Sequence, residues 1–327
     1  MKSIFYKLVF SNPIFWLTGH IRNPLIFVIL RSLPESSVRR YLSKIFDPNL
    51  IRKRVSIKFK RKMIKCKFSA DMGTYLIDVN DHIGYQSFIT GEFDSTVLKV
   101  ARRLDLSPSD VLLDIGANTG LVSIPFAKEF SASVIGIEAS ASNAWILKRN
   151  VQLNSVNFKL HNICAVGPEL HKENKYISFY SKNGNSGASS IYKNWNKSRI
   201  SQESESVLTS TVDDLLDLSE INSIKLVKLD VEGAEEEVLK GFKSIRDIDG
   251  PILFEFRIDL MSRDLDNDGS GFLSLLKANF VLFGLDFSDA GHVNLIPFNV
   301  QQSTGMAIGL PLKNLEKFKK IFLLTGF

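Results

Sequence analysis

Runs of hydrophobic residues that end in an acidic residue recur along the middle of the chain. They have strand length, and they carry Asp114, Glu138, Asp230 and Glu255 at or near their carboxyl ends. Uninterrupted apolar runs are typical of strands that are buried on both faces of a parallel sheet. Open sheets of this kind bind ligands at the carboxyl ends of their strands. The pattern therefore predicts an α/β fold in which the four acids converge.

Apolar residues at helical spacing separate these runs and continue beyond them. Helices are expected at 93–104, 141–150 and 271–280, and further strands at 73–79, 158–166, 281–287 and 304–310. The stretch 167–223 is longer than a crossover requires, and its runs at 176–180 and 206–212 suggest an inserted hairpin or edge strands. The polar loop 183–190 fits either a lid or a disordered surface excursion. The strands of the body predict a seven-stranded sheet.

The first acidic strand leads into the loop Gly116-Ala117-Asn118-Thr119-Gly120. Its glycines allow a sharp turn and a close approach of the backbone to a ligand. A dinucleotide fingerprint would need glycines where Asn118 and Leu121 stand, so the loop does not suit a pyrophosphate. It suits a cofactor with an adenosine and no pyrophosphate, for which S-adenosylmethionine (SAM) is the obvious candidate. A turn without a ligand is the alternative.

Acidic and polar residues at the next strand ends extend this prediction. Asp114 would accept from the amino group of SAM directly or through water, and Gly116 would leave room for its methionine part. Glu138 lies 24 residues after Asp114, close to the spacing of about 20 residues at which an acid reaches ribose hydroxyls. The loop after the third strand is expected to contact the adenine, with Asn162, Cys164 and Ala165 as candidates.

A second cluster of polar residues follows the strand that begins at Ile224. It has the sequence Lys228-Leu229-Asp230-Val231-Glu232-Gly233-Ala234-Glu235 and leads into another helix. Asp230 could be a functional carboxylate or only the N-cap of that helix. Lys228 could be a buried stem paired with a neighbouring acid, and residues 235–237 a solvated helix start.

With these motifs in place, the sequence resembles the FkbM-type methyltransferases over about residues 89–256. The similarity takes in the glycine loop, Glu138, Asn150-x-x-Leu153-Asn154, Thr211-Val212-Asp213-Asp214-Leu215 and, most specifically, Lys-x-Asp-x-Glu-Gly-x-Glu at 228–235. The resemblance implies a Rossmann-like class I methyltransferase fold, with a mostly parallel seven-stranded sheet whose last strand is antiparallel. The cofactor-binding residues carried over are Asp114, Gly116, Asn118, Gly120 and Glu138, and the expected set also includes Ala117 of the same loop and Ala165 after the third strand.

The same resemblance implies methyl transfer from SAM to hydroxyl groups, commonly of sugars or secondary metabolites, with Asp230 and Glu232 facing the reaction. A sugar hydroxyl is a weak nucleophile at neutral pH, and a base that takes its proton accelerates such a reaction by about 10²–10⁴-fold. We expect Asp230 to be that base or a metal ligand, with Glu232 as the next candidate. Asp230 and Glu255 together offer the hard oxygens that Mg²⁺ prefers.

Charge divides the chain into a basic beginning and an acidic body. Residues 1–68 hold 16 Lys or Arg against two acids, whereas the remainder holds 25 against 33. The apolar runs before residue 35 are broken by Pro and basic residues, and none reaches the ~18–20 residues of a membrane span. They suggest a segment that lies in a membrane interface, or a helical pair packed on the body or on a second subunit. We divide the chain into an N-terminal extension (1–70), a methyltransferase domain (71–312) and a C-terminal tail (313–327).

The expected function is O-methylation of a small-molecule or glycan acceptor, such as a saccharide or another polyhydroxylated compound. With only two cysteines in the chain, a cytoplasmic protein is expected, with peripheral contact at the inner membrane face through residues 1–68. A nucleic-acid methyltransferase is a rival because the chain is basic, but the carboxylates of the site would repel phosphate. A membrane-associated adaptor that keeps the fold without the chemistry is the second alternative.

Overall fold

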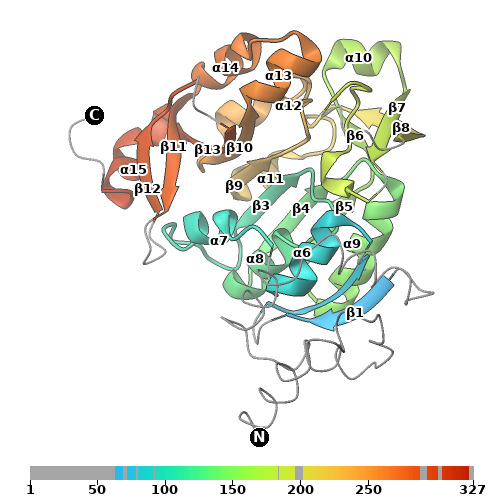
Figure 1. Ribbon diagram of the computed structural model, residues 1–327. Coiled ribbons are helices and arrows are strands. Elements are labelled where there is room, and N and C mark those ends of the chain that lie inside the picture. The colour runs from blue at the N-terminus through green and yellow to red at the C-terminus, as the bar shows by residue number, and fades with distance from the viewer. Residues whose placement is uncertain are drawn as a thin grey trace, which may run out of the picture.

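The computed structural model describes residues 63–68, 72–78, 80–91, 93–182, 184–195, 202–287, 293–300 and 304–323. Its centre is an eight-stranded sheet with the strand order β12-β11-β13-β10-β9-β3-β4-β5, and helices pack on both faces (Figure 1). Two smaller sheets, β1-β2 and β6-β8-β7, accompany it. Residues 1–62, and with them most of the predicted membrane contact, lie outside the described residues.

Five neighbouring strands of the main sheet run parallel. They are β5 (Phe158–His161), β4 (Ser133–Ile137), β3 (Val111–Ile115), β9 (Ile224–Leu229) and β10 (Ile252–Arg257). β13 (Thr304–Pro311) pairs antiparallel with β10 on one side and with β11 (Phe280–Phe287) on the other. This arrangement is the predicted Rossmann-like class I methyltransferase fold, with its antiparallel last strand inserted between two others.

Residues of the central strands alternate between two hydrophobic cores. On one face Leu113 and Phe254 pack with residues of α12 (Glu235–Lys240), α13 (Ile258–Leu265) and α14 (Ser270–Lys277). On the other face Leu112 and Leu253 pack with α7 (Thr96–Ala101), α8 (Ser123–Phe130) and α15 (Leu315–Ile321). Because both faces are covered, the central strands are mostly apolar, and their acidic residues stand at or near the carboxyl ends.

Side chains of α9 (Ala141–Asn154) hold an N-terminal hairpin against the domain. The hairpin consists of β1 (Met63–Lys67) and β2 (Thr74–Asp78), and α6 (His82–Thr90) follows it. Asn150 accepts from the N–H of Leu76 at 2.6 Å, and Asn154 accepts from the N–H of Thr74 at 2.9 Å and donates to its carbonyl at 2.8 Å. The two asparagines thus bond to strand backbone as a neighbouring strand would.

The stretch between β5 and β9 contains the predicted hairpin. β7 (Tyr176–Lys182) pairs antiparallel with β8 (Gln202–Ser210), and β8 pairs parallel with the short β6 (Cys164–Ala165). α10 (Pro168–Glu173) precedes the hairpin, the 3₁₀ turn η1 (Ser186–Ala188) lies between its strands, and α11 (Leu218–Ser223) follows it. The helix α11 begins with a capping box between Asp217 and Glu220.

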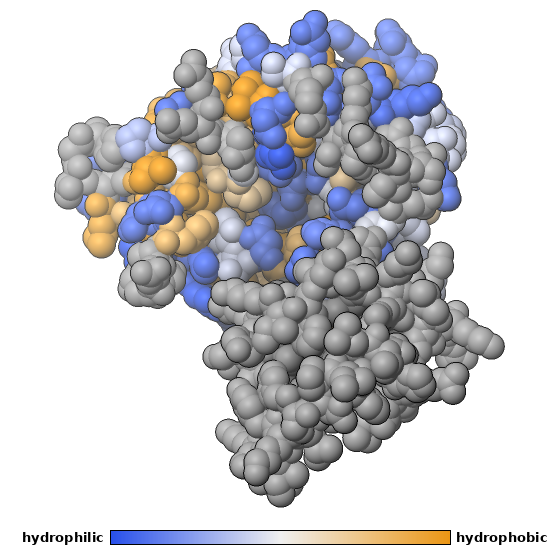
Figure 2. Space-filling view, in the orientation of Figure 1, coloured by the Kyte–Doolittle hydropathy of each residue, from blue (hydrophilic) through white to orange (hydrophobic). Residues whose placement is uncertain are grey.

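The main sheet has eight strands rather than the predicted seven. The additional strand, β12 (Val293–Pro297), pairs antiparallel with β11 at the edge and alternates buried with exposed residues. Such a short half-buried strand lacks the continuous apolar run by which the central strands were found. Figure 2 shows hydrophobic residues gathered on the surface at this end of the sheet, where Phe287 and Ile296 are 37% and 45% exposed.

Three further expectations needed correction. The third strand, expected at 158–166, is split into β5 and β6, which join different sheets. The helix expected at 93–104 is only the six-residue α7, and α6 was not predicted. The segment expected to be a C-terminal tail contains α15, whose Phe318 is buried in the core. In the part of the chain that the structure describes, no helix is both long and apolar enough to cross a membrane.

Candidate active site

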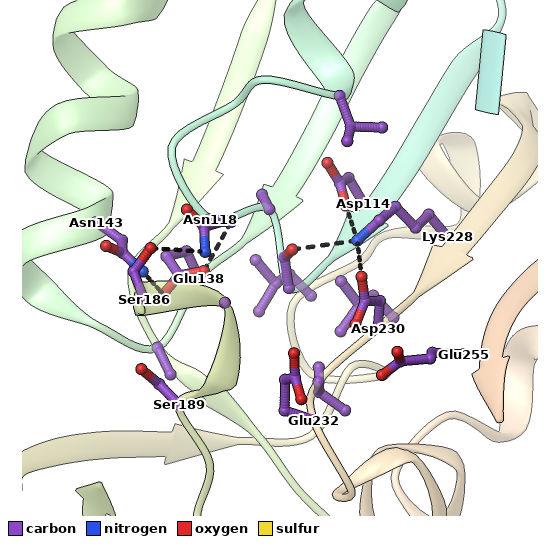
Figure 3. Close-up of a pocket in the computed structure, with 18 of the residues that line it drawn as sticks. Asp114, Asn118, Glu138, Asn143, Ser186, Ser189, Lys228, Asp230, Glu232 and Glu255 are labelled. Carbon is purple, nitrogen blue, oxygen red and sulfur yellow. Dashed lines mark hydrogen bonds and ion pairs between the residues drawn. The ribbon is translucent and has the colours of Figure 1, made fainter. Parts of the chain in front are cut away.

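A cavity of about 290 Å³ opens at the carboxyl ends of β3, β4, β9 and β10 (Figure 3). Asp114, Glu138, Asp230 and Glu255 all contribute to its wall, so the four acids predicted to converge do meet at one site. Small-molecule sites commonly have volumes of about 300–1,000 Å³, and this cavity is close to the lower limit.

The glycine loop after β3 forms one wall of the cavity. Gly116 has a φ of +86°, and a Cβ there would lie 1.8 Å from the carbonyl oxygen of Asp230, so a larger residue does not fit. Ala117 and Asn118 also line the cavity. Gly120, with a φ of +81°, faces away from it, and a Cβ there would meet Leu147 at 2.4 Å. The second glycine therefore serves the packing of α9 beneath the loop.

A buried lysine joins the two acids at the tips of β3 and β9. The Lys228 ammonium lies 3.4 Å from Asp114 Oδ1 and 3.1 Å from Asp230 Oδ2, and it donates to the carbonyl of Gly116 at 3.3 Å. Burial alone would lower the pKa of Lys228, but the charges of Asp230 and Asp114 outweigh it and raise that pKa. Lys228 is therefore a buried lysine paired with neighbouring acids, which was one of the two interpretations of the sequence, and it stays charged.

Asp114 keeps its capacity to bind a further partner. Its side chain is fully buried, and neither carboxylate oxygen accepts a hydrogen bond from any described residue. It forms an ion pair with the Lys228 ammonium at 3.4 Å. Buried polar groups in proteins are nearly always hydrogen-bonded, so a carboxylate at a cavity wall that accepts no hydrogen bond marks a place for a ligand with N–H or O–H donors.

Glu138 closes the opposite side of the cavity. Its carboxylate accepts from the backbone N–H groups of Asn118 and Ser140, both at 2.8 Å, and from the side chain of Asn143 at 3.4 Å. Burial raises its pKa to about 7, although these hydrogen bonds act in the other direction. Oε2 accepts only the bond from Asn118 and has capacity for another donor.

Three carboxylates gather at the end of the cavity beyond Lys228. Asp230, Glu232 and Glu255 each bring one oxygen within 4.8 Å of the others, and Figure 3 shows Glu232 and Glu255 directed toward each other. Burial raises the pKa of Glu232 to about 8, with Asp230 adding to it and the indole of Trp195 opposing it. Burial also raises the pKa of Glu255, and the charges of Asp230 and Glu232 raise it further.

Glu235 is buried under the loop that carries these acids, which corrects the expectation of a solvated helix start. Its side chain is 1% exposed, and Oε1 accepts from the N–H groups of Val231 and Gly233 at 3.0 and 3.2 Å. Burial raises its pKa to about 7. The helix α12 begins at Glu235 with Ala234 as its N-cap, so Asp230 is not a helix cap.

The inserted segment 184–195 covers part of the cavity, as a lid would. Ser186, Gly187 and Ser189 line the cavity, and Asn118 Nδ2 lies 3.5 Å from Ser186 Oγ. At its other end the buried Trp195 donates from Nε1 to Glu232 Oε2 at 2.9 Å. The alternative of a disordered excursion therefore does not hold for these residues.

The predicted adenine contacts divide into two groups. Cys164 and Ala165 line the cavity, whereas Asn162 turns its amide to the carbonyl oxygens of Glu138 and Ala139 at 2.9 and 3.2 Å. Burial raises the pKa of the Cys164 thiol to about 12, in keeping with an inert core cysteine.

Sequence reasoning missed Trp195 and the buried Glu235. Trp195 lies 37 residues before Glu232 in a polar stretch, and no local pattern signals their contact. Its one available signal was that a large aromatic residue rarely stands in a solvated loop without a packing partner.

A parallel sheet with one antiparallel inserted strand, and an acid-lined cavity at its glycine turn, is the arrangement of class I methyltransferases. Within this fold, residues 114–266 match the family model of the methyltransferase FkbM domain. The family match at these residues confirms the resemblance that the motifs indicated.

Solved structures with a related fold are only distantly similar. Precorrin-6y C5,15-methyltransferase from Geobacter metallireducens is 13% identical with a TM-score of 0.35, over 66% of this chain and 87% of that one. M. jannaschii TYW2 in complex with AdoMet is 13% identical with a TM-score of 0.39, over 77% and 86%. Pyrococcus abyssi tRNA (uracil-54, C5)-methyltransferase is 13% identical with a TM-score of 0.38, over 77% and 44%. No curated protein matches the chain in sequence.

Proposed function

We propose that this methyltransferase uses SAM to methylate a hydroxyl group of a saccharide or another polyhydroxylated acceptor. The observation that carries the proposal is one cavity with two features: a buried carboxylate, Asp114, that accepts no hydrogen bond from the described residues, and a cluster of three carboxylates at one end. Asp114 could accept a hydrogen bond from the amino group of the cofactor, and the carboxylate cluster could accept the proton of an acceptor hydroxyl.

The residues of the cavity fit SAM. Asp114 would accept from its amino group, and Glu138 has acceptor capacity left for a ribose hydroxyl. Gly116 has no Cβ and so allows the close approach of the loop, and Ala117, Asn118 and Ala165 also line the cavity. Gly120 would support the loop from behind. When bound, SAM supplies a methyl group attached to a positively charged sulfur.

Glu232 is the better placed of the two predicted acids to take the hydroxyl proton. Burial raises its pKa to about 8, and a general base works best when its pKa lies near the operating pH. The charge of Asp230 is offset by Lys228 at 3.1 Å, so Asp230 would orient the hydroxyl by accepting its hydrogen bond. Orientation of the reacting atoms can supply roughly 7–11 kcal/mol of a barrier.

The acidic cluster of Asp230, Glu232 and Glu255 restricts which methyl acceptors can bind beside it. A phosphate group here would meet these three carboxylates. Of the nearby cations, Lys228 is already paired with Asp114 and Asp230, and Arg257 with Asp259. Like charges that are partly buried repel each other. A neutral polyhydroxylated acceptor is therefore favoured over a nucleic acid. Salt-sensitive retention of the protein on RNA would count against this part of the proposal.

We also propose that the same carboxylate cluster binds a divalent cation. The predicted pair Asp230 and Glu255 lies together with Glu232 at distances that one ion could bridge. Mg²⁺ keeps several waters and is commonly bound by one or two carboxylates. Titration calorimetry with MgCl₂ should give a binding signal that Glu255→Gln abolishes. The absence of a signal in the wild-type protein, with and without SAM, would remove the metal from the proposal.

Calorimetric titration of SAM and of its demethylated product tests the cofactor part. We expect micromolar binding that Glu138→Ala weakens by about 1.5–3 kcal/mol, the range for a hydrogen bond to a charged group. Glu173→Ala, which removes an exposed glutamate of α10, should leave the affinity unchanged. No binding of either compound would refute the proposal, and binding without turnover on any polyhydroxylated acceptor would favour the adaptor alternative.

A further inference from the structure

Trp195, in the described part of the insert, contacts the reacting end of the site. Its indole is 1% exposed, and Nε1 donates to Glu232 Oε2 at 2.9 Å. The ring also lies flat against the next residue of the loop: a Cβ at Gly233 would be 2.5 Å from Trp195 Cε3. The indole thus contacts both a cavity carboxylate and the backbone beside it.

The opposite end of the described insert is fastened at the cofactor end of the cavity. The backbone N–H of Ser186 donates to the Asp81 carboxylate, and Ser186 Oγ lies 3.5 Å from Asn118 Nδ2. Asp81 is the N-cap of α6, whose Ile83 is also part of the cavity wall. We call residues 184–195 the cap, because they extend from the cofactor loop to the acid cluster.

Glu232 needs an external support to keep its position. Asp230 and Glu255 lie close enough to repel it, and its own φ of +54° is uncommon for a residue with a side chain. Among the described residues, Trp195 is the only hydrogen-bond donor to the Glu232 carboxylate. Filling the space beside Gly233 would not require a tryptophan, since phenylalanine also presents a flat ring. The N–H directed at the carboxylate is what distinguishes this residue.

We propose that Trp195 is a positioning residue that holds the Glu232 carboxylate toward the acid cluster, where the acceptor would bind. The cap and this carboxylate would then reach their final positions together. An acceptor would then enter while the cap is displaced, and Glu232 would be in position only once the cap has returned. This rests on the proposed function where it treats Glu232 as the residue that faces the acceptor hydroxyl. The physical coupling itself does not depend on the acceptor.

The coupling is tested on the full-length protein with ¹⁵N-labelled tryptophan. The chain has three tryptophans, so three indole N–H signals are expected, and Trp195→Phe identifies one by its loss. Glu232→Ala should shift the Trp195 signal and speed its exchange with solvent, because the acceptor is gone. Glu232→Gln, which keeps an amide oxygen, should retain protection. A Trp195 signal that is indifferent to Glu232→Ala would overturn the proposal.

Hydrogen exchange followed by mass spectrometry measures whether the two segments move together. Trp195→Phe should speed exchange in both 184–195 and 230–235, whereas Trp145→Phe, at an exposed tryptophan of α9, should speed neither. Faster exchange in the cap alone would contradict the coupling.

Turnover gives the functional readout. Trp195→Phe should leave SAM affinity within about twofold and lower kcat by roughly 10- to 100-fold, the loss expected when a reacting group is misplaced by about 1 Å. The double variant with Glu232→Gln should be no slower than Glu232→Gln alone, because the two residues act as a unit. A wild-type kcat in Trp195→Phe would refute the positioning role. If the wild-type protein bound no SAM, the proposed function would fail, while the indole and exchange results would still decide the coupling.

Discussion

Replacing Glu235 by glutamine should change how the stability of the protein depends on pH. Glu235 is 1% exposed, and its Oε1 accepts two N–H groups of the loop that carries Glu232. Glutamine has nearly the same shape and keeps an acceptor oxygen, so Glu235→Gln removes the charge while it retains the contacts. The variant therefore isolates the cost of a buried carboxylate.

The magnitude follows from the pKa shift. Burial raises the pKa of Glu235 from 4.5 to about 7, and each pKa unit corresponds to about 1.4 kcal/mol. Because the folded state holds the proton more tightly than the unfolded state, the stabilisation is complete below pH 4.5 and is lost as pH rises through 7. Wild-type protein should therefore lose about 3 kcal/mol relative to Glu235→Gln between pH 4.5 and pH 8.

Urea denaturation at a series of pH values measures this difference. Glu138 and Glu232 also have raised pKa values, about 7 and about 8, so both proteins should lose stability as pH rises, the wild type more steeply. Glu237→Gln is the matched control, since Glu237 lies in the same helix and pairs at the surface with Lys240. Parallel curves for wild type and Glu235→Gln would show that the carboxylate is not buried as described.

Two further predictions concern buried groups of the site. Lys228→Met should destabilise the protein by about 3–5 kcal/mol in urea denaturation, because it leaves the buried Asp114 without its cation. Arg102→Ala, which breaks an exposed ion pair with Glu129, should cost less than about 1 kcal/mol in the same assay. Equal losses would contradict the burial of Lys228. Cys164, whose pKa burial raises to about 12, should resist iodoacetamide in the native protein at pH 8 and react after unfolding, as measured by peptide mass mapping; native labelling at the rate of a free thiol would refute its burial.

The parallel strands and their terminal acids could be predicted from the sequence because both signals are local. A run such as Val111–Ile115 is apolar on both faces, and the acid stands at its end in the same few residues. The same locality explains the glycine loop, whose turn is set by Gly116 itself. The cavity wall was therefore largely predictable before any contact was known.

Contacts between distant segments could not be predicted in this way. Glu235 stands in an acidic run that is typical of a solvated helix start, and its burial depends on amide groups that only the folded loop directs toward it. Trp195 reaches Glu232 from a turn in the insert between β7 and β8, and nothing around it in sequence indicates that neighbour. α6 was a different case, because Asp81 and Gly91 at its two ends are ordinary helix boundary signals that could have been used.

The position of β13 has a consequence for synthesis of the protein. The strand lies between β10 and β11, although both precede it in the chain. During translation, the facing edges of β10 and β11 therefore stay unpaired until residues 304–311 have been made. Unpaired apolar strand edges are templates for aggregation. A ribosome that stalls before residue 304 would leave a chain that cannot close its own sheet, and such a chain would be a substrate for chaperones or proteases.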